Sequence, residues 1–175
     1  MSARVTTLLS ATYSFGINTG QSMLAKTWRE LERVRNATSS DDRRDAVINC
    51  AITAWHLTDW FWAGLTEKDM DRVELAKLLG VEGRRVTKDD FVKWIVQRCP
   101  EMAICQAICN GSKHVACGSP VHTKLGAPQD STKRGRQLVA QATVVDGSGE
   151  TDAIELLSRV IDFWWLQTSS EMQMM

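Results

Sequence analysis

Two short segments of this 175-residue chain hold the side chains best suited to acid–base chemistry. The first reads Ala-Trp-His-Leu-Thr-Asp-Trp over residues 54–60, and the second reads Cys-Asn-Gly-Ser-Lys-His over residues 109–114. Histidine is the side chain whose ordinary pKa best suits proton transfer near neutral pH, and the chain has only three. Because His56 and His114 fall in these two segments, we expect a catalytic site to draw on both.

The first segment places polar groups on one line of a predicted helix. His56 and Asp59 are three residues apart, which separates them by about 60° around the helix. Asn49 and Thr53 fall close to the same line, so a polar stripe crosses a helix that is otherwise apolar. Buried polar groups need hydrogen-bonding partners. We therefore expect a second polar surface to face this stripe.

The second segment offers partners for that stripe. Gln106 and Asn110 are four residues apart, and Lys113 or His114 continues the same helical spacing. We expect the Asp59 carboxylate to pair with Lys113 or to orient His114. A structural interpretation remains open, in which the stripes form a satisfied polar network that fixes helix register. Lys113 also suits the electrostatics of a helix C-terminus.

Metal binding is an alternative for the same residues. His56, Asp59 and His114 are ligand types found in open zinc or iron sites, although their spacing forms no compact motif such as HExxH. The chain has five cysteines, an odd number, and no CxxC pair. We therefore predict no metal and no cofactor, with a metal-dependent enzyme as an alternative.

Composition excludes several classes of protein. The 21 basic and 21 acidic side chains give zero net charge, whereas dedicated nucleic-acid binders carry a basic excess. This balance argues against broad electrostatic binding of nucleic acid but allows a local basic patch. Cations near residues 122–136, Lys124 among them, could contact phosphates locally, although a solvated loop explains them equally well. The cysteines suit a reducing compartment, so we expect a cytoplasmic protein. The longest apolar stretch, residues 52–65, is interrupted by polar residues and predicts no membrane span.

These segments require helices to position them. The apolar spacing predicts a mainly α fold, a helical bundle of about five or six helices in a single domain spanning residues 1–175. The helix over residues 42–65 is apolar almost all round, as is typical of the centre of a bundle. The helix over residues 21–37 has four apolar residues on its inner face: Leu24, Trp28, Leu31 and Val34.

Shorter helices are expected over residues 66–80, from Thr87 onward, and over residues 100–110. Thr87 and Asp90 have the spacing of a capping box, and Gly111 is a typical residue after a helix end.

The amino-acid composition changes from residue 115 onward. Between residues 115 and 146, glycines and prolines predict loop with a small β-hairpin or edge strand, and residues 137–145 have the pattern of a strand. Thr151 is expected to cap a last helix over residues 152–167. The ends of the chain, residues 1–20 and 168–175, are predicted to be poorly ordered.

The seven tryptophans indicate an aromatic packing centre or a subunit interface. Five of them form two clusters: Trp55, Trp60 and Trp62, and Trp164 with Trp165. We expect a homodimer that forms through these tryptophan-rich helices. A non-enzymatic dimeric interaction or scaffold protein is therefore the main alternative to an enzyme.

The pattern Trp-His-x-x-Asp-Trp followed by Asn-Gly-x-Lys-His resembles a group of small uncharacterised bacterial and phage proteins over roughly residues 20–166. Residues 109–114 also resemble the motif of HEPN domains, which reads Arg, a polar residue that is often Asn, three variable residues and His. Asn110 and His114 match this motif, and Cys109 stands at the arginine position.

HEPN domains are helical bundles, often dimeric, and many are metal-independent ribonucleases of toxin–antitoxin and phage-defence systems. The resemblance implies a protein that acts on RNA, or an inactive descendant that lacks the phosphate-positioning arginine. It would make His114 the general acid or base, Asn110 the group that orients the phosphate, and Lys113 a source of compensating charge. His56 and Asp59 would support these catalytic residues.

Overall fold

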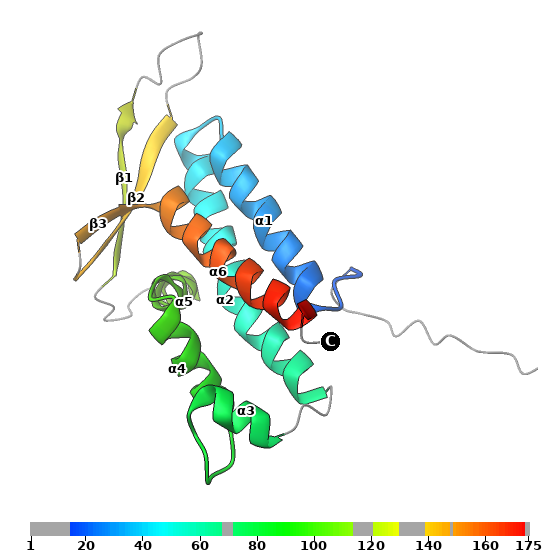
Figure 1. The fold of residues 1–175 in the computed structure, drawn as a ribbon. Coiled ribbons are helices and arrows are strands. Elements are labelled where there is room, and N and C mark those ends of the chain that lie inside the picture. The colour runs from blue at the N-terminus through cyan, green and yellow to red at the C-terminus, as the bar shows by residue number, and fades with distance from the viewer. Residues whose placement is uncertain (1–14, 68–71, 114–120, 130–138, 148, 174–175) are drawn as a thin grey trace, which may run out of the picture.

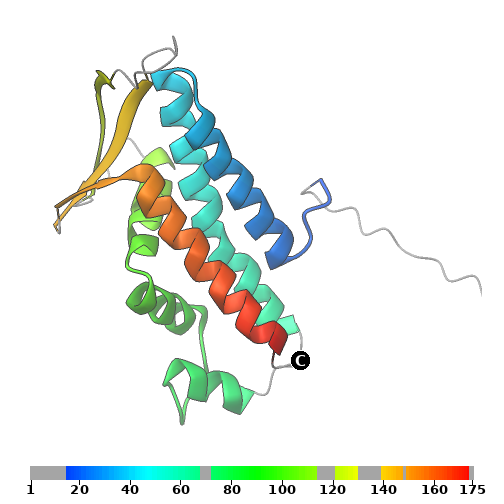
Figure 2. The same cartoon turned by 45° about the horizontal axis from the view of Figure 1, so that its top comes forward.

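The computed structural model describes residues 15–67, 72–113, 121–129, 139–147 and 149–173. Within these residues it contains six helices and one three-stranded antiparallel sheet. Three long helices lie side by side, with the sheet at one end of them and two short helices at the other (Figures 1 and 2). This arrangement confirms the predicted helical bundle with a small β element.

The first two helices form an antiparallel pair. Helix α1 (Gly20–Asn36) begins at Thr19, whose hydroxyl accepts a hydrogen bond from the Ser22 amide while the Ser22 hydroxyl accepts one from the Thr19 amide. Gly20 then approaches the Phe61 ring so closely that a Cβ atom would lie 2.7 Å from it. Only glycine therefore allows the first turn of α1 to pack against Phe61 without a shift of that ring.

Helix α2 (Ser40–Glu67) is the central element of the bundle. One broad side of this helix faces the core, and its residues Cys50, Ala51, Ala54 and Leu57 are fully buried. The opposite side carries exposed residues at Asp45, Asn49, Asp59 and Ala63. The prediction of a helix that is apolar almost all round was therefore wrong.

Three shorter helices follow α2. They are α3 (Arg72–Leu79), α4 (Lys88–Arg98) and α5 (Glu101–Lys113). The capping box predicted from Thr87 and Asp90 is confirmed at the start of α4. Helix α5 continues two residues beyond Gly111, where the sequence predicted its end. None of the helices in the described part of the chain combines the length and hydropathy needed to cross a bilayer.

The sheet consists of β1 (His122–Gln129), β2 (Val139–Asp146) and β3 (Gly149–Asp152) in that spatial order. The strand predicted over residues 137–145 corresponds to β2, which pairs with both neighbours. Strand β3 was not predicted, because it is only four residues long. Ala142 and Val144 of β2 are buried, so this small sheet shares the core of the bundle.

The last helix, α6 (Ala153–Gln173), runs back along the bundle toward the start of α1 (Figure 1). Its N-terminus is capped by Asp152, whose carboxylate accepts hydrogen bonds from the amides of Ile154 at 2.8 Å and Glu155 at 3.2 Å. Thr151, the predicted cap, is instead the third residue of β3. The predicted disorder of the C-terminal tail was wrong for residues 168–173, which belong to α6.

An aromatic cluster around Trp164 joins α6 to the other helices. Trp164 is 2% exposed and stacks on Phe61 with ring centroids 4.6 Å apart. Phe91 and Phe163 also lie beside Trp164, and Trp62 and Trp94 extend the cluster. Trp165, the next residue, is 63% exposed. The prediction of a tryptophan-rich packing centre is therefore confirmed for Trp164, and Trp165 is an exception to it because adjacent helical residues point about 100° apart.

The two adjacent tryptophans provide a matched test of this packing. We expect Trp164→Ala to lower the free energy of unfolding by about 3–5 kcal/mol, because it leaves a large cavity in the aromatic cluster. Trp165→Ala should cost less than about 1 kcal/mol, because that side chain is mostly in water. Chemical denaturation followed by circular dichroism at low protein concentration measures both changes. Equal losses in the two variants would contradict this description of the core.

The start of α4 gives a pH-dependent contribution to stability. Hydrogen bonds from the Arg84 guanidinium, followed by those from Thr87, lower the pKa of the buried Asp90 carboxyl far below its ordinary 3.8. Because the folded-state pKa lies below the unfolded one, this stabilisation is complete above the unfolded pKa and is lost as the pH falls toward the folded one.

We therefore expect the urea midpoint of the wild type to fall between about pH 6 and pH 3 more steeply than that of Asp90→Asn. Asp89→Asn, an exposed neighbour, serves as the control and should keep the wild-type slope. Identical pH profiles for Asp90→Asn and the wild type would show that this carboxylate contributes nothing.

Candidate functional site

The Asp59 carboxylate lies on the outer side of α2 and is exposed. Its ion-pair partner is Lys88, the first residue of α4, rather than Lys113 as predicted. Asp59 therefore links α2 to the beginning of α4. This pairing, between two half-exposed side chains, is of the kind that contributes little to stability.

The polar stripe on α2 is partly exposed and partly faces polar side chains of α1. Asn49 and Asp59 are exposed, and His56 is half-buried. Thr53 is the buried member, and its hydroxyl donates to the Asn49 carbonyl at 2.7 Å and accepts from the Lys26 ammonium at 2.9 Å. The expected polar partner of Thr53 is therefore present, but α1 supplies it, and the segment at residues 109–113 does not.

The same lysine belongs to a charged cluster that the sequence did not reveal. Glu30 is 5% exposed, and its carboxylate pairs with Lys26 at 2.9 Å and Arg33 at 2.6 Å. Burial by itself would raise the pKa of the Glu30 carboxyl, but the hydrogen bonds and charges of Arg33 and Lys26 outweigh burial and lower it. Since Lys26 also binds Thr53, this cluster fixes α1 against α2.

The second predicted segment lies at the other end of α2. The C-terminal turns of α5, at Ala107, Ile108 and Gly111, share a cleft with Val47 and Ile48 of α2. Asp59 lies 11 residues beyond Ile48, which corresponds to about 16 Å along the helix axis.

The four described site candidates therefore form two separate pairs. His56 and Asp59 share the outer side of α2, whereas Asn110 and Lys113 are exposed at the end of α5. His114, the predicted acid or base, lies outside the described residues. The convergence of both segments on one site is not seen among the residues that the structure describes.

Position 109, where the HEPN motif has arginine, faces the core. Cys109 is completely buried on the inner side of α5. An arginine at this position would have to leave the core to reach a phosphate. Cys105, one turn earlier, is also buried, and burial raises the pKa of its thiol well above the ordinary value. A buried thiol of this kind is unreactive, so Cys105 packs as a small apolar side chain.

A cleft of about 510 Å³ opens where α2, α5 and the sheet meet. It falls within the size range of small-molecule sites. Most of its lining residues are apolar, and Arg44 and Lys124 are the two cations among the described residues that line it. The residues that line the cleft come from α2, α5, β1, β2 and α6 and from the residue before β1. They are Arg44, Val47, Ile48, Ala107, Ile108, Gly111, Ser112, Val121, Thr123, Lys124, Leu125, Ala142, Thr143, Val144 and Ala153.

The cations around this cleft can exchange partners at little cost. The Arg44 side chain is 50% exposed and pairs with Asp41 at 3.0 Å and Asp45 at 3.3 Å, and the Lys124 ammonium is 3.8 Å from Glu150. Exposed ion pairs of this kind are worth at most about 1 kcal/mol. Lys113, which follows Ser112 at the end of α5, has no ion-pair partner in the described part of the chain. A bound anion could therefore replace the present partners.

The arrangement suits a ligand with an anionic group and an apolar portion. The C-terminal end of α5 carries partial negative charge, which Lys113 in its last turn offsets, so the positive charge near the cleft comes from Arg44, Lys124 and Lys113. The sequence marked Lys124 only as a loop cation that could contact phosphate. It could not reveal the cleft, because the lining residues come from distant segments and only folding brings them together.

A metal centre lacks support in the described part of the chain. There, no group of three or more His, Cys, Asp or Glu side chains could hold a metal ion. The alternative set of His56, Asp59 and His114 includes a residue outside the described ranges. Asp59, in addition, already pairs with Lys88.

No protein-family model, no curated protein and no solved structure matches this chain. Its function must therefore be inferred from its own residues and geometry.

Proposed function

We propose that this protein binds single-stranded RNA through the cleft between α2, α5 and the sheet. The observation that supports the proposal is that Arg44 and Lys124 are among the lining residues of a mainly apolar cleft, next to the end of α5 that carries Lys113. The resemblance of residues 109–114 to the HEPN motif favours RNA over other phosphate-bearing ligands.

The cleft would hold one nucleotide by complementary contacts. Arg44 and Lys124 would bind backbone phosphate, because cations supply most of the affinity of proteins for nucleic acids. Val47, Ile48 and Val121 would contact the ribose or the base through their apolar surfaces. No aromatic side chain lines the cleft within the described residues, so stacking would be weak and sequence preference small.

Zero net charge limits the expected affinity. For single strands the logarithm of the binding constant falls by about 0.7 per phosphate contact for each tenfold rise in salt. With three cations, Arg44, Lys113 and Lys124, we expect a slope of about −2. A local site of this kind is compatible with a chain that has no overall basic excess.

RNA cleavage is the finer form of the proposal. His114 would then act as the general acid or base, Asn110 would orient the phosphate, and Lys113 would offset developing negative charge. His56 and Asp59 have no role in this cleavage mechanism, because they lie on the outer side of α2, far from the C-terminal end of α5.

Charge reversal at the cleft tests RNA binding. We expect Arg44→Glu and Lys124→Glu each to weaken binding of a labelled single-stranded RNA by about tenfold or more at low salt, because each replaces a phosphate contact with repulsion. Lys93→Glu changes an exposed lysine on α4, outside the cleft, and serves as the matched control. Fluorescence anisotropy measures all three. Equal losses in the cleft and control variants would refute binding at this site.

Cleavage is tested separately with His114→Ala and Asn110→Ala. If the chain cleaves RNA as HEPN ribonucleases do, chelation of metals should leave the rate unchanged, and His114→Ala should reduce it by at least about a hundredfold. Gel analysis of labelled RNA across a range of pH gives the rate. A wild type as inert as His114→Ala would refute RNA cleavage. RNA binding would then be judged from the anisotropy data alone.

A further inference from the structure

Two tryptophans are exposed on neighbouring helices, away from the residues of the cleft. Trp28 on α1 is 47% exposed, and Trp165 on α6 is 63% exposed. Leu166, next to Trp165, is 64% exposed. The sequence placed Trp28 on the inner face of its helix, which was wrong. Large exposed aromatic side chains that gather in one patch are a feature of interaction surfaces.

A hydrogen bond between α1 and α6 shows that the two tryptophans lie at the same level. The Arg35 guanidinium donates to the Ser158 hydroxyl at 3.0 Å, so these residues face one another across two antiparallel helices. Trp28 precedes Arg35 by seven residues, and Trp165 follows Ser158 by seven. Because seven residues are nearly two full turns, both tryptophans return to the same face and the same height.

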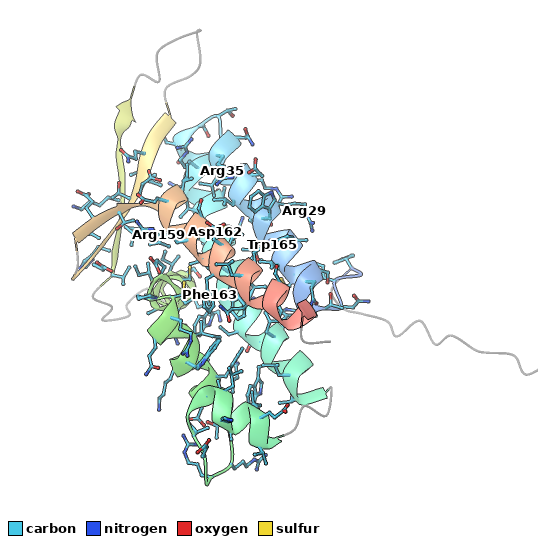
Figure 3. The ribbon with its side chains drawn as sticks, viewed as in Figure 1. Arg29, Arg35, Arg159, Asp162, Phe163 and Trp165 are labelled. Atoms are coloured by element: carbon cyan, nitrogen blue, oxygen red, sulfur yellow. The ribbon has the colours of Figure 1, made fainter. Side chains whose placement is uncertain are left out.

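Opposite charges flank this aromatic pair. Arg29 lies on the α1 side and Asp162 on the α6 side, with Trp165 between them (Figure 3). Neither Arg29 nor Asp162 has an ion-pair partner within the described ranges. We call the surface formed by Trp28, Arg29, Asp162 and Trp165 the tryptophan face. Across it, a basic flank, an aromatic centre and an acidic flank follow one another.

This order of side chains is self-complementary. A two-fold axis that runs parallel to the helices would lay α1 of each copy on α6 of the other. Trp28 would then contact Trp165 of the second copy, and Arg29 would approach Asp162 of the second copy. Because the symmetry repeats every contact, two such ion pairs would flank one aromatic core.

We propose that the tryptophan face binds a second copy of this chain in this two-fold arrangement. The 17 residues of α1 give a contact about 25 Å long, and two helices give a width of about 20 Å. The face thus offers roughly 500 Å² per partner, which is the low end for specific interfaces. The dimer should therefore form with a dissociation constant in the micromolar range.

Complementary charge reversals test this arrangement. Arg29→Glu places two like charges opposite each other at the interface, and so does Asp162→Arg. Each variant alone should weaken self-association by at least about tenfold.

In an equimolar mixture the two variants should associate with each other. In that mixed dimer the glutamate introduced at position 29 of one copy faces the arginine introduced at position 162 of the other, and the second contact keeps the native Asp162 and Arg29. The double variant Arg29→Glu/Asp162→Arg should likewise recover affinity to within a few-fold of the wild type.

Sedimentation equilibrium over roughly 1–200 μM, a range that brackets the affinity expected of a small interface, measures each dissociation constant. Circular dichroism confirms that each variant stays folded. Lys93→Glu is again the control and should dimerise like the wild type. Trp165→Ala should abolish dimerisation in this concentration range. A wild type that remains monomeric, or a dimer indifferent to both single charge reversals, would overturn the proposal.

Discussion

The fold depends on covering the apolar side of α2. This helix has 28 residues and is about 42 Å long, so no single neighbour of ordinary length can cover it. Helix α1 covers one flank, α6 covers another around Phe61, and α4, α5 and the sheet share the remainder. Each fully buried aliphatic side chain contributes roughly 1.5–3 kcal/mol. The surrounding elements are therefore ordered by their contact with one central helix.

Different elements contact α2 along its length, and this explains where the cleft lies. Toward its C-terminal end α2 contacts α4 through Asp59 and α6 through Phe61, whereas Val47 and Ile48 near its N-terminal end line the cleft with α5 and the sheet. The cleft lies where the end of α5 and the sheet meet the N-terminal half of α2. Among the described residues, two cations line this cleft, Arg44 of α2 and Lys124 of β1.

The proposed dimer has a consequence for the proposed RNA site. A two-fold axis parallel to the helices keeps the direction of every helix, so both sheets and both clefts would lie at the same end of the dimer. Two weak sites on one particle can bind a single strand with a much higher overall affinity than either site alone. Modest binding by each cleft would thus be compatible with effective recognition of longer RNA. The tryptophan face and the cleft share no residue, so either can exist without the other.

Local signals in the sequence determined most of the secondary structure. The apolar spacing located both ends of α1 and α2 to within two residues and the start of α6 to within one, although α6 ends six residues later than predicted. Thr87 with Asp90 marked the start of α4, because capping depends on atoms three residues apart. The strand pattern located β2. The short strand β3 and the helix cap at Asp152 were not predicted, because the pairing of this strand and the geometry of this cap arise only when the sheet forms.

The candidate site shows where sequence reasoning ended. Helical spacing correctly grouped Asn49, His56 and Asp59 on one side of α2, but it cannot say whether that side meets a partner or water. Spacing likewise treated Trp164 and Trp165 as one cluster, although one is in the core and the other is exposed. The pairing of Asp59 with Lys88, and the meeting of Arg44 with Lys124 at a cleft, were decided only by tertiary packing. Such contacts join residues that are distant in the chain, and the periodicity of a single helix carries no information about what will cover it.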